Sequence, residues 1–344
     1  MSEPSSTAYP PITDRPVRWG LLAAGRIARA FAAAVADAEG GEVVAVAARD
    51  ASRAQEFARD LGVPRAYGGY EELYADPEVD VVYISSTHPF HADQAVAALQ
   101  AGKHVVVEKP TALTVRDTER IFEAARAAGR FAMEAMWTRC LPLVQDVVGR
   151  VRDGQIGTPR SLAAAFTVPF DYDEDHRLFD LANGGGALLD IGIYPVTLAH
   201  LLLGHPTHVQ VIGSTAPTGA DDLVGLQWMT PEGAVAQVLC DSRSSGASRT
   251  VVRGTTGWIE VHGPVNDPES FTVYRGRESE GELVGGERRG LVHEAEEVHR
   301  CLRAGLPESP AVPHADTVAI MTILESARRE LGVRYPQEEE PLHT

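Results

Sequence analysis

The chain has 344 residues, of which 44% are hydrophobic and 23% charged, as in a folded protein long enough for two domains. Its formal charge of −17 disfavours nucleic acid and anionic membrane as partners, because both carry negative charge. The three cysteines, Cys140, Cys240 and Cys301, are far apart and form no CxxC pair. Neither a disulfide framework nor a metal site is therefore indicated, and a reducing cytoplasm is expected.

Both ends of the chain are expected to be unstructured tails. Residues 1–16 are rich in Ser and Pro and lack the apolar core of a signal peptide, and residues 337–344 are acidic. The most apolar later segment, 187–203, contains Asp190, Pro195 and His200. We interpret it as too short and too polar to span a bilayer.

Residues 17–137 alternate apolar runs with helical patterns, and they form the first expected domain. A helix is expected to follow Gly25, and Ser52 is the expected N-cap of the next one. The expected strands are 17–23, 42–48, 80–85, 104–107 and 130–133, and the later helices are 52–61, 92–100 and 116–128. Strands that are apolar throughout and alternate with helices predict an α/β fold, a doubly wound parallel sheet of the Rossmann type.

Residues 138–336 form the second expected domain, and their pattern is different. β-rich segments occur at 161–166 and between 208 and 262, with Pro231-Glu232-Gly233 as a hairpin turn. Helices are expected at 288–303 and 314–331. This pattern predicts an α+β domain with a large, mostly antiparallel open sheet and helices on one side.

The first strand, turn and helix carry a nucleotide-binding pattern. The fingerprint G-x-G-x-x-G/A is met by Ala23, Gly25 and Ala28, so its first glycine is replaced by alanine. A glycine at the helix start lets the backbone approach a pyrophosphate, and the free N–H groups there favour anions. We therefore expect Ala23, Gly25, Arg26 and Ile27 to contact a dinucleotide.

The end of the second strand indicates which dinucleotide binds. An acid that holds the NAD ribose normally lies ~20 residues after the fingerprint. Ala48 and Arg49 stand there, and Arg53 follows one helical turn later. Because an arginine attracts a 2′-phosphate that a carboxylate would repel, NADP is the expected cofactor. The alternative is that Arg49 is only a surface residue and Asp50 holds the ribose of NAD.

Two further loops follow parallel strands, where open α/β sheets bind ligands. Glu108 and Lys109 follow the strand at 104–107. A lysine just past so apolar a strand can be partly desolvated, which would lower its pKa toward proton transfer; the alternative is an ordinary surface lysine. The other loop, which follows the strand at 80–85, supplies four candidate cofactor contacts: Ser86, Thr87, His88 and His91.

The second domain contributes a triple glycine, 184–186, followed by Asp190 and Tyr194. A helix would place these two polar residues, four apart, on one face. Both lie in an apolar run, where an unpaired polar side chain is costly. Pro195 disfavours helical geometry at Tyr194, so the sequence does not settle whether the two residues share a helix face. The alternative is a buried, hydrogen-bonded structural pair.

Together these motifs resemble the glucose–fructose oxidoreductase / inositol dehydrogenase (Gfo/Idh/MocA) family over about 17–336. The stretch 133–139 and the C-terminal pattern at 301–313 resemble its branch of dimeric trans-1,2-dihydrobenzene-1,2-diol dehydrogenases and NADP-dependent D-xylose 1-dehydrogenases. The resemblance implies that Lys109, Asp190 and Tyr194 surround the substrate carbon beside the nicotinamide. Many relatives have histidine where Tyr194 stands and asparagine where His88 stands, but this branch shares the residues of this chain.

The expected activity is reversible NADP-dependent oxidation of a carbinol carbon in a sugar or cyclic diol, bound in the cleft between the domains. Trp137 and Arg139 are candidates for its wall and for the cofactor site, with ordinary packing as the alternative. The rival functions are a nucleotide-sugar ketoreductase and a regulator that binds NAD(P) without catalysis. The family's open sheet implies a homodimer or higher oligomer, since an uncovered apolar face normally finds a partner.

Overall fold

The computed structural model describes residues 9–276 and 281–338. Within these, the chain divides into two compact units. The first comprises the described residues up to Cys140 together with Arg289–Val318, and the second comprises Leu141–Arg288 and the described residues from Ala319 on. The sequence placed all of 138–336 in one domain. An amphipathic pattern shows that a helix buries one face but not which surface covers it, and α8 (Leu291–Ala304) packs on α1 (Arg26–Asp37) of the first unit.

The first unit is built on a six-stranded sheet in the order β3-β2-β1-β4-β5-β6, with every neighbouring pair parallel. This confirms the predicted Rossmann sheet, and the strands β1, β4, β5 and β6 are buried almost throughout. The strands are β1 (Val17–Leu22), β2 (Gly41–Ala47), β3 (Arg65–Tyr67), β4 (Val81–Ile84), β5 (His104–Glu108) and β6 (Ala132–Ala135).

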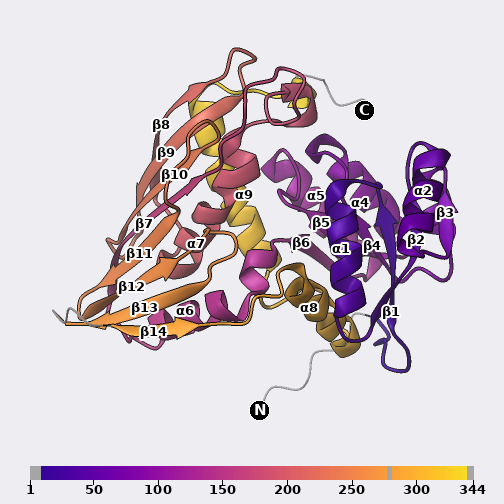
Figure 1. The fold of residues 1–344 in the computed structure, drawn as a ribbon, viewed down its shortest axis with the longest axis horizontal. Helices are drawn as coiled ribbons and strands as arrows, with labels where there is room; N and C mark the ends of the chain where they lie inside the picture. Colours follow the sequence, from indigo (N-terminus) through magenta and orange to yellow (C-terminus); the bar gives the residue numbers. More distant parts are fainter. Residues whose placement is uncertain (1–8, 277–280, 339–344) are drawn as a thin grey trace. The chain divides into compact units, whose positions relative to one another are not determined.

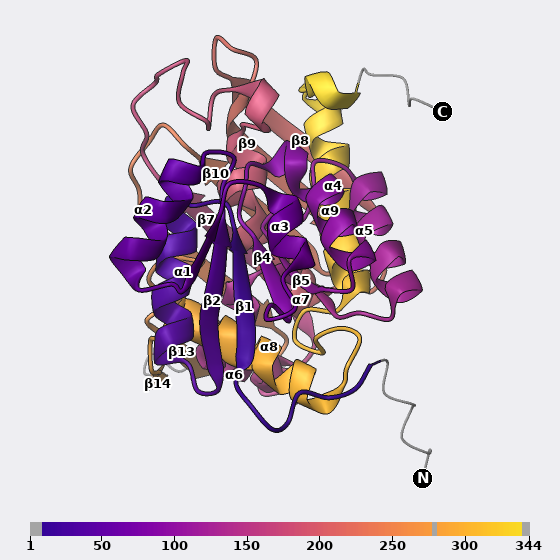
Figure 2. The ribbon, with the colours of Figure 1, turned by 90° about the vertical axis from the view of Figure 1, so that its right-hand side faces the viewer.

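Helices cover both faces of this sheet. In Figure 2, α1 and α2 lie on one side of β1 and β2, and α3, α4 and α5 lie on the other. Asp50, not Ser52, is the N-cap of α2, because the helix begins one residue earlier than expected, at Ala51. The Asp50 carboxylate accepts a hydrogen bond from the Ser52 N–H. The remaining helices are α2 (Ala51–Leu61), α3 (Tyr70–Ala75), α4 (His91–Gln100) and α5 (Val115–Ala128).

The expected N-terminal tail is shorter than the sequence suggested. Tyr9 and Ile12 are buried, the Tyr9 hydroxyl donates to the carbonyl oxygen of Leu306 at 2.6 Å, and Ile12 N–H donates to that of Leu302 at 3.3 Å. Burial of the aromatic ring beside the end of α8 orders this segment, although its Ser/Pro-rich composition predicted an unstructured tail. Residues 1–8 lie outside the described part.

The second unit holds an eight-stranded sheet in the order β14-β13-β12-β11-β7-β10-β9-β8. Only the β7–β10 pair is parallel, so the prediction of a mostly antiparallel sheet is confirmed. The strands are β7 (Pro159–Thr167), β8 (His208–Thr215), β9 (Asp221–Met229), β10 (Val235–Asp241), β11 (Arg249–Gly254), β12 (Gly257–His262), β13 (Ser270–Arg275) and β14 (Glu282–Gly285).

Helices lie on one side of this sheet and, among the described residues, no element covers its other side (Figure 1). The strands alternate accordingly: in β9, Val224, Leu226 and Trp228 are buried, whereas Leu223 and Met229 are exposed. The helices of the unit are α6 (Pro142–Arg152), α7 (Ile193–Leu203) and the larger part of α9 (His314–Glu330).

The apolar segment that ends in α7 is the core of the second unit. The stretch Leu181–Leu203, at 23 residues, is long and apolar enough to cross a membrane by length and composition, contrary to the expectation. However, 83% of the 18-residue apolar window within it is buried inside the protein, as in the core helix of a folded domain. Burial by the protein itself therefore accounts for its hydropathy.

The C-terminal tail also begins later than expected. Residues Pro336–Glu338 form a short helical turn. Glu338 pairs with the buried guanidinium of Arg328, and the Gln337 amide donates to the carbonyl oxygen of Ala182 at 2.8 Å. An acidic residue opposite a buried arginine is held in place by charge. Residues 339–344 lie outside the described part.

Candidate active site

The turn between β1 and α1 adopts the backbone that the nucleotide fingerprint requires. Ala23 has φ +79°, and it is the one residue other than glycine with a positive φ among those described. This left-handed conformation is the one that the first fingerprint glycine normally supplies. The turn therefore keeps the glycine geometry although the glycine is absent.

Gly25 is the N-cap of α1, and the backbone is open at this point. No side chain caps the helix, and its first turn holds no acidic residue. A Cβ placed on Gly25 would meet nothing within 4 Å. The helix start thus presents free N–H groups to open space, which fits the pyrophosphate of a dinucleotide. Arg26 is exposed and Ile27 half-buried beside it.

Two arginines stand where the second strand ends. Arg49 and Arg53 are both exposed, and both lower the pKa of Tyr70, which burial raises. The Arg49 guanidinium also lies 5.9 Å from the centre of the Phe90 ring. Neither arginine forms an ion pair with a described residue. The arrangement is a positive pair flanked by two aromatic rings, which sequence reasoning did not find because Tyr70 and Phe90 are distant in sequence.

Asp50, the alternative ribose contact, is committed to the helix. Its carboxylate accepts from Ser52 N–H at 2.8 Å, and the hydrogen bonds at this helix start lower its pKa. The side chain is exposed, but its lone pairs already serve the N-terminus of α2.

The loop after β4 is held by an interior histidine. His91 is fully buried; its Nδ1 lies 3.0 Å from the carbonyl oxygen of Pro110 and its Nε2 3.0 Å from that of Ser86, and burial lowers its pKa. The ring therefore ties the loop after β4 to the loop after β5 and offers no surface to a ligand, unlike the expected contact. Thr87 and His88 are half-buried at the same loop.

Lys109 follows directly on a buried acid. The Glu108 carboxylate accepts from the Tyr83 hydroxyl and, at 3.1 Å, from the Lys109 backbone N–H. The Tyr83 ring stacks on Phe31 at 3.8 Å between ring centres. Lys109 itself is half-buried, beside the cis Lys109–Pro110 peptide, and its charge contributes to the lowered pKa of His91. The predicted loop is thus anchored from behind while the lysine remains accessible.

Behind this loop the first unit buries further acids that sequence reasoning did not select. Glu134 accepts hydrogen bonds from Thr111 N–H at 3.1 Å and Thr317 Oγ1 at 3.2 Å, and burial raises its pKa. Glu294 is fully buried, and burial, together with the charges of Glu108 and Glu134, raises its pKa well above the usual range.

Trp137 and Arg139 begin the segment that leaves the Rossmann sheet. Arg139 is 3% exposed; its Nε donates to the Ala311 carbonyl at 2.7 Å and its Nη2 pairs with Asp316 at 2.6 Å. It therefore supports the packing of Arg289–Val318, the alternative considered from the sequence, and does not line an open pocket. Trp137 is half-buried.

In the second unit, the triple glycine leads into a helix that carries Asp190. The five residues Leu188–Gly192 form a π-helical turn, η4, which continues as α7. Such turns are rare and are frequent at functional sites. Asp190 is buried, and its carboxylate pairs with Arg177, with Oδ2 3.0 Å from Nη2. Arg177 precedes the triple glycine and is a site neighbour that the sequence analysis missed.

Tyr194 lies in the first turn of α7. Pro195 follows η4 inside one helical segment, and Tyr194 keeps helical geometry there although a proline follows it, which differs from the bias that the sequence suggested. Tyr194 is 7% exposed and makes an edge-to-face contact with Phe166, at 5.9 Å between ring centres. Asp190 and Tyr194 thus stand in one continuous helical segment, four residues apart.

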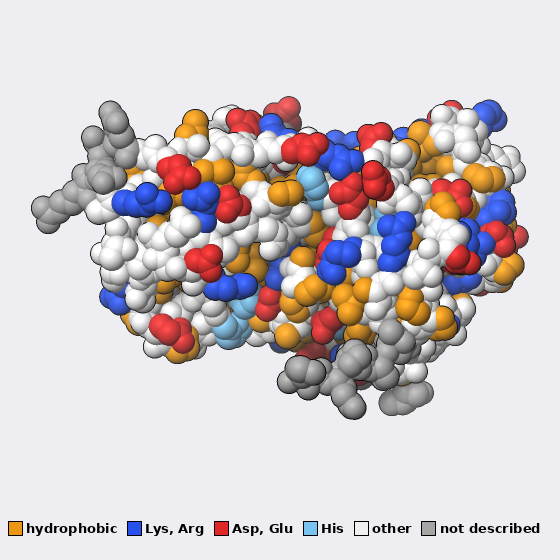
Figure 3. Space-filling view, turned by 90° about the horizontal axis from the view of Figure 1, so that it is seen from below, with side chains coloured by type: hydrophobic (Ala, Val, Ile, Leu, Met, Phe, Trp, Pro, Cys, Tyr) orange, Lys and Arg blue, Asp and Glu red, His pale blue; other side chains and the backbone are white. Residues whose placement is uncertain are grey.

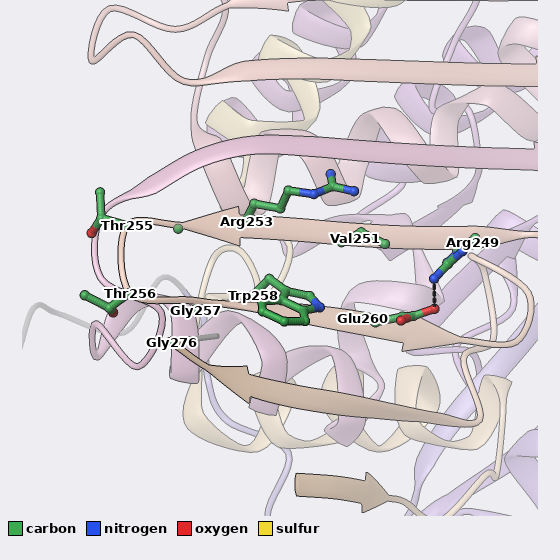
Figure 4. A pocket seen from close by; sticks show the side chains of 10 residues that line it. Arg249, Val251, Arg253, Thr255, Thr256, Gly257, Trp258, Glu260 and Gly276 are labelled. Carbon is green, nitrogen blue, oxygen red and sulfur yellow. Dashed lines mark ion pairs between the residues drawn. The ribbon is translucent and has the colours of Figure 1, made fainter. Parts of the chain in front are cut away.

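The second unit also has a surface cavity, which none of the expected site residues lines. A cavity of about 710 Å³ lies on the uncovered face of the eight-stranded sheet, where Arg249, Arg253, Trp258 and Glu260 project from β11 and β12 (Figure 4). Arg249 and Glu260 form an ion pair at 2.6 Å. On the side of the molecule drawn in Figure 3, acidic and basic side chains are intermixed, without a broad field of either sign.

Comparison with known proteins accounts for both units. A model described as "Oxidoreductase family, NAD-binding Rossmann fold" (GFO_IDH_MocA) matches residues 17–136, and one described as "GFO/IDH/MocA C-terminal domain" matches residues 144–260. The trans-1,2-dihydrobenzene-1,2-diol dehydrogenase of Mus musculus is 36% identical, over 94% of this chain and 99% of its own length. That of Oryctolagus cuniculus is 38% identical, over 86% and 92%.

Solved structures share the whole fold. An aldose-aldose oxidoreductase from Caulobacter crescentus, complexed with glycerol, superposes with a TM-score of 0.85 at 24% identity, covering 92% of this chain and 98% of that one. A 3-ketoreductase from Actinomadura kijaniata, complexed with NADP and TDP-benzene, superposes with a TM-score of 0.81 at 27% identity, covering 93% and 99%.

Proposed function

The chain belongs to the Gfo/Idh/MocA family of NAD(P)-binding oxidoreductases that act on CH–OH groups, and we propose that it is an NADP-dependent dehydrogenase of a sugar or cyclic diol. The observation that carries the proposal is the pairing of an open, glycine-capped helix start with two arginines, Arg49 just after β2 and Arg53 in α2. The curated relatives with 36–38% identity, named as dihydrodiol dehydrogenases, support the diol class of substrate.

NADP is preferred in this proposal because Arg49 and Arg53 place two positive charges where a 2′-phosphate would lie. Arg49→Ala is expected to weaken NADP binding by roughly 1.5–3 kcal/mol, the scale of a charged hydrogen bond, and to leave NAD nearly unchanged. The matched control is Arg59→Ala, which removes an exposed arginine from the last turn of α2. The ratio of kcat/KM for the two cofactors measures the effect; a tenfold preference of the unmodified protein for NAD, by order of magnitude, would refute it.

The proposed catalytic residues are Lys109, Asp190 and Tyr194. A bound nicotinamide supplies the hydride acceptor, which is the chemistry that the side chains lack. Tyr194 takes the hydroxyl proton of the substrate, and Lys109 stabilises oxyanion charge. Asp190, held by Arg177, orients the substrate hydroxyl. Glu108 anchors the backbone from which Lys109 projects.

A screen of aldoses, cyclic diols and sugar lactones, read by NADPH absorbance, tests the activity. Lys109→Met is expected to lower kcat by about 10²-fold with nearly unchanged NADP affinity. Tyr194→Phe should cost a similar factor and abolish the alkaline rise in rate if Tyr194 is the base, but only about tenfold if Lys109 is. Near-normal kcat in both variants would remove the site assignment and favour a regulator that binds the cofactor without catalysis.

A second candidate is a nucleotide-sugar ketoreductase. The specific observation in its favour is the fold shared with the 3-ketoreductase at 27% identity, whose structure contains NADP and TDP-benzene. The two candidates differ in substrate: the ketoreductase requires a nucleotide-linked keto sugar, whereas the dehydrogenase oxidises free aldoses or diols. Adding TDP-linked sugars to the screen therefore separates them.

The three free cysteines are compatible with a reducing cytoplasm, in which we place the reaction.

For the uncovered sheet face we propose a second copy of the chain as its partner. Ile212 of β8, Met229 of β9 and Leu239 of β10 are exposed there, and Ile212 is 78% exposed. Large apolar side chains on one face are normally covered, most often by a two-fold dimer. Sedimentation at micromolar concentration should give a dimer that Ile212→Glu with Leu239→Glu dissociates, whereas Leu61→Glu, on α2, does not. A monomer of the unmodified protein would contradict the proposal.

A further inference from the structure

A buried carboxylate, Asp221, lies beneath the triple glycine. It is the first residue of β9 and fully buried. Its Oδ2 accepts a hydrogen bond from Leu188 N–H at 2.6 Å. Gly186 has φ +139°, and a Cβ on it would lie 2.3 Å from Asp221 Oδ1. The loop thus closes over the carboxylate so tightly that a side chain at Gly186 has no room.

The N–H that Asp221 holds belongs to the start of the catalytic helix. Leu188 is the first residue of η4, and the residue before it, Ala187, provides no side-chain cap. The first N–H groups of a helix lack internal partners and favour negative charge. Two residues further on, Asp190 N–H donates to the carbonyl oxygen of Gly186 at 3.2 Å. Asp221 and the glycine loop therefore fix the helix end next to Asp190.

The other side of the loop is held as well. The Gly185 carbonyl oxygen accepts a hydrogen bond from the Tyr335 hydroxyl at 3.0 Å, and the Tyr335 ring packs under the Arg328 guanidinium at 4.4 Å. A Cβ on Gly192 would lie 2.8 Å from the sulfur of Cys240 in β10. The segment from Gly185 to Gly192 is thus pinned from below, and Asp221 is its one direct contact to the first helical N–H among the described residues.

We propose that Asp221 is a positioning residue for this reaction, an internal cap that holds η4 and thereby the orientations of Asp190 and Tyr194. The inference rests on the proposed function, because it assumes that these two residues serve the reaction. Asp221 touches no substrate; it acts by keeping the start of the helix in one conformation, as a preorganised support of a catalytic group must.

Asp221 also makes the support depend on pH. Burial raises its pKa to about 6, Leu188 N–H and Arg328 of α9 lower it, and Asp222 raises it; Cys240 of β10 and the Tyr335 hydroxyl face the same carboxylate. Above about pH 6 the carboxylate accepts a charge-assisted bond from Leu188. Below that pH the protonated acid is a weaker acceptor, so the helix start loosens.

The test compares Asp221→Asn, Asp221→Ala and the control Asp222→Asn. Asp222 lies on the same strand as Asp221, and its carboxylate accepts a hydrogen bond from Ser214 Oγ of β8 at 2.7 Å. Asp221→Asn keeps an acceptor without charge, so kcat at pH 8 should fall about 3- to 10-fold and lose its acid limb near pH 6. Asp221→Ala removes the acceptor, and kcat should fall by about 10-fold or more. Binding of NADPH, followed by its fluorescence, should be unchanged in both, since the cofactor residues belong to the other unit.

Unfolding supplies a readout that does not depend on activity. A carboxyl whose folded pKa lies above its usual value binds its proton more tightly when folded. Its stabilising contribution is present below about pH 4 and is lost as pH rises to about 6, so this slope should disappear in Asp221→Asn. The same unfolding measurements also show whether the variants are folded.

Three results would decide against the proposal. Wild-type kcat in Asp221→Ala, or an acid limb that persists in Asp221→Asn, would overturn it. An equal loss in Asp222→Asn would show a general weakening of the strand instead. If Lys109→Met and Tyr194→Phe are also fully active, the proposed function has failed; if they are impaired while Asp221→Ala is not, only the inference has failed.

Discussion

Two glycine turns, each leading into a helix, solve opposite problems in the two units. At Gly25 an added Cβ would meet nothing within 4 Å, whereas at Gly185 it would lie 2.6 Å from the carbonyl oxygen of Leu178, and at Gly186 2.3 Å from Asp221. The first turn leaves a helix start open for an anion from outside. The second fills the same kind of space with the protein's own backbone and carboxylate. Glycine thus leaves open space at a helix start in one unit and permits close internal packing in the other.

The largest expected effect comes from filling the closed turn. Gly185→Ala would put a methyl group within 3 Å of three backbone oxygens, those of Arg177, Leu178 and Asp180. Backbone cannot move aside as the end of a flexible side chain does, so we expect a loss of about 3 kcal/mol or more in the free energy of unfolding. Chemical denaturation of the variant beside the unmodified protein measures it. A loss below about 1 kcal/mol would show that the loop can relax.

The open turn should respond in the opposite way. Gly25→Ala is expected to change the free energy of unfolding by less than about 1 kcal/mol, since φ is −93° and no atom lies within 4 Å. Its methyl group would occupy the space for the pyrophosphate, so the dissociation constant for NADPH should rise about tenfold or more. The matched control is Gly149→Ala in α6, which also has no atom within 4 Å. Equal NADPH binding in both variants would mean that the cofactor does not approach Gly25.

Sequence patterns found the open turn more readily than the closed one, for a physical reason. Strand, turn and helix follow each other locally at Gly25, and the alternation of apolar strands predicts the parallel sheet around them. The contact of Gly186 with Asp221 joins residues from two elements, and no local pattern encodes it. In the same way the hydropathy of α8 indicated a buried face without showing that α1 covers it.

Side-chain chemistry was predictable where a loop follows a strand, and less so inside the protein. Lys109 is found at the end of a buried strand, as expected, and Asp190 and Tyr194 in one helical segment. His91 and Arg139 were expected to contact ligands but are buried supports. Residue type does not distinguish a polar group facing a ligand from one that satisfies backbone carbonyls. Only the packing around it does.

The smallest expected effect concerns Ala23, the alanine that replaces the first fingerprint glycine in the open turn. Ala23 has φ +79°, a conformation that costs an L-residue roughly 1–2 kcal/mol, whereas glycine adopts it freely. Glycine also loses more entropy on folding, by about 0.5–1 kcal/mol, so Ala23→Gly should raise the free energy of unfolding by about 0.5–1 kcal/mol.

The neighbouring residue provides the control with the opposite sign. Ala24 does not have a positive φ, so Ala24→Gly gains no relief of strain and should lower the free energy of unfolding by about 0.5–1 kcal/mol. Denaturant titrations of the two variants, made on the same day with the same protein concentration, resolve a difference of about 1–2 kcal/mol between them. If both lower stability equally, Ala23 is not strained, and the alanine in the fingerprint then fits its turn as well as the glycine that it replaces.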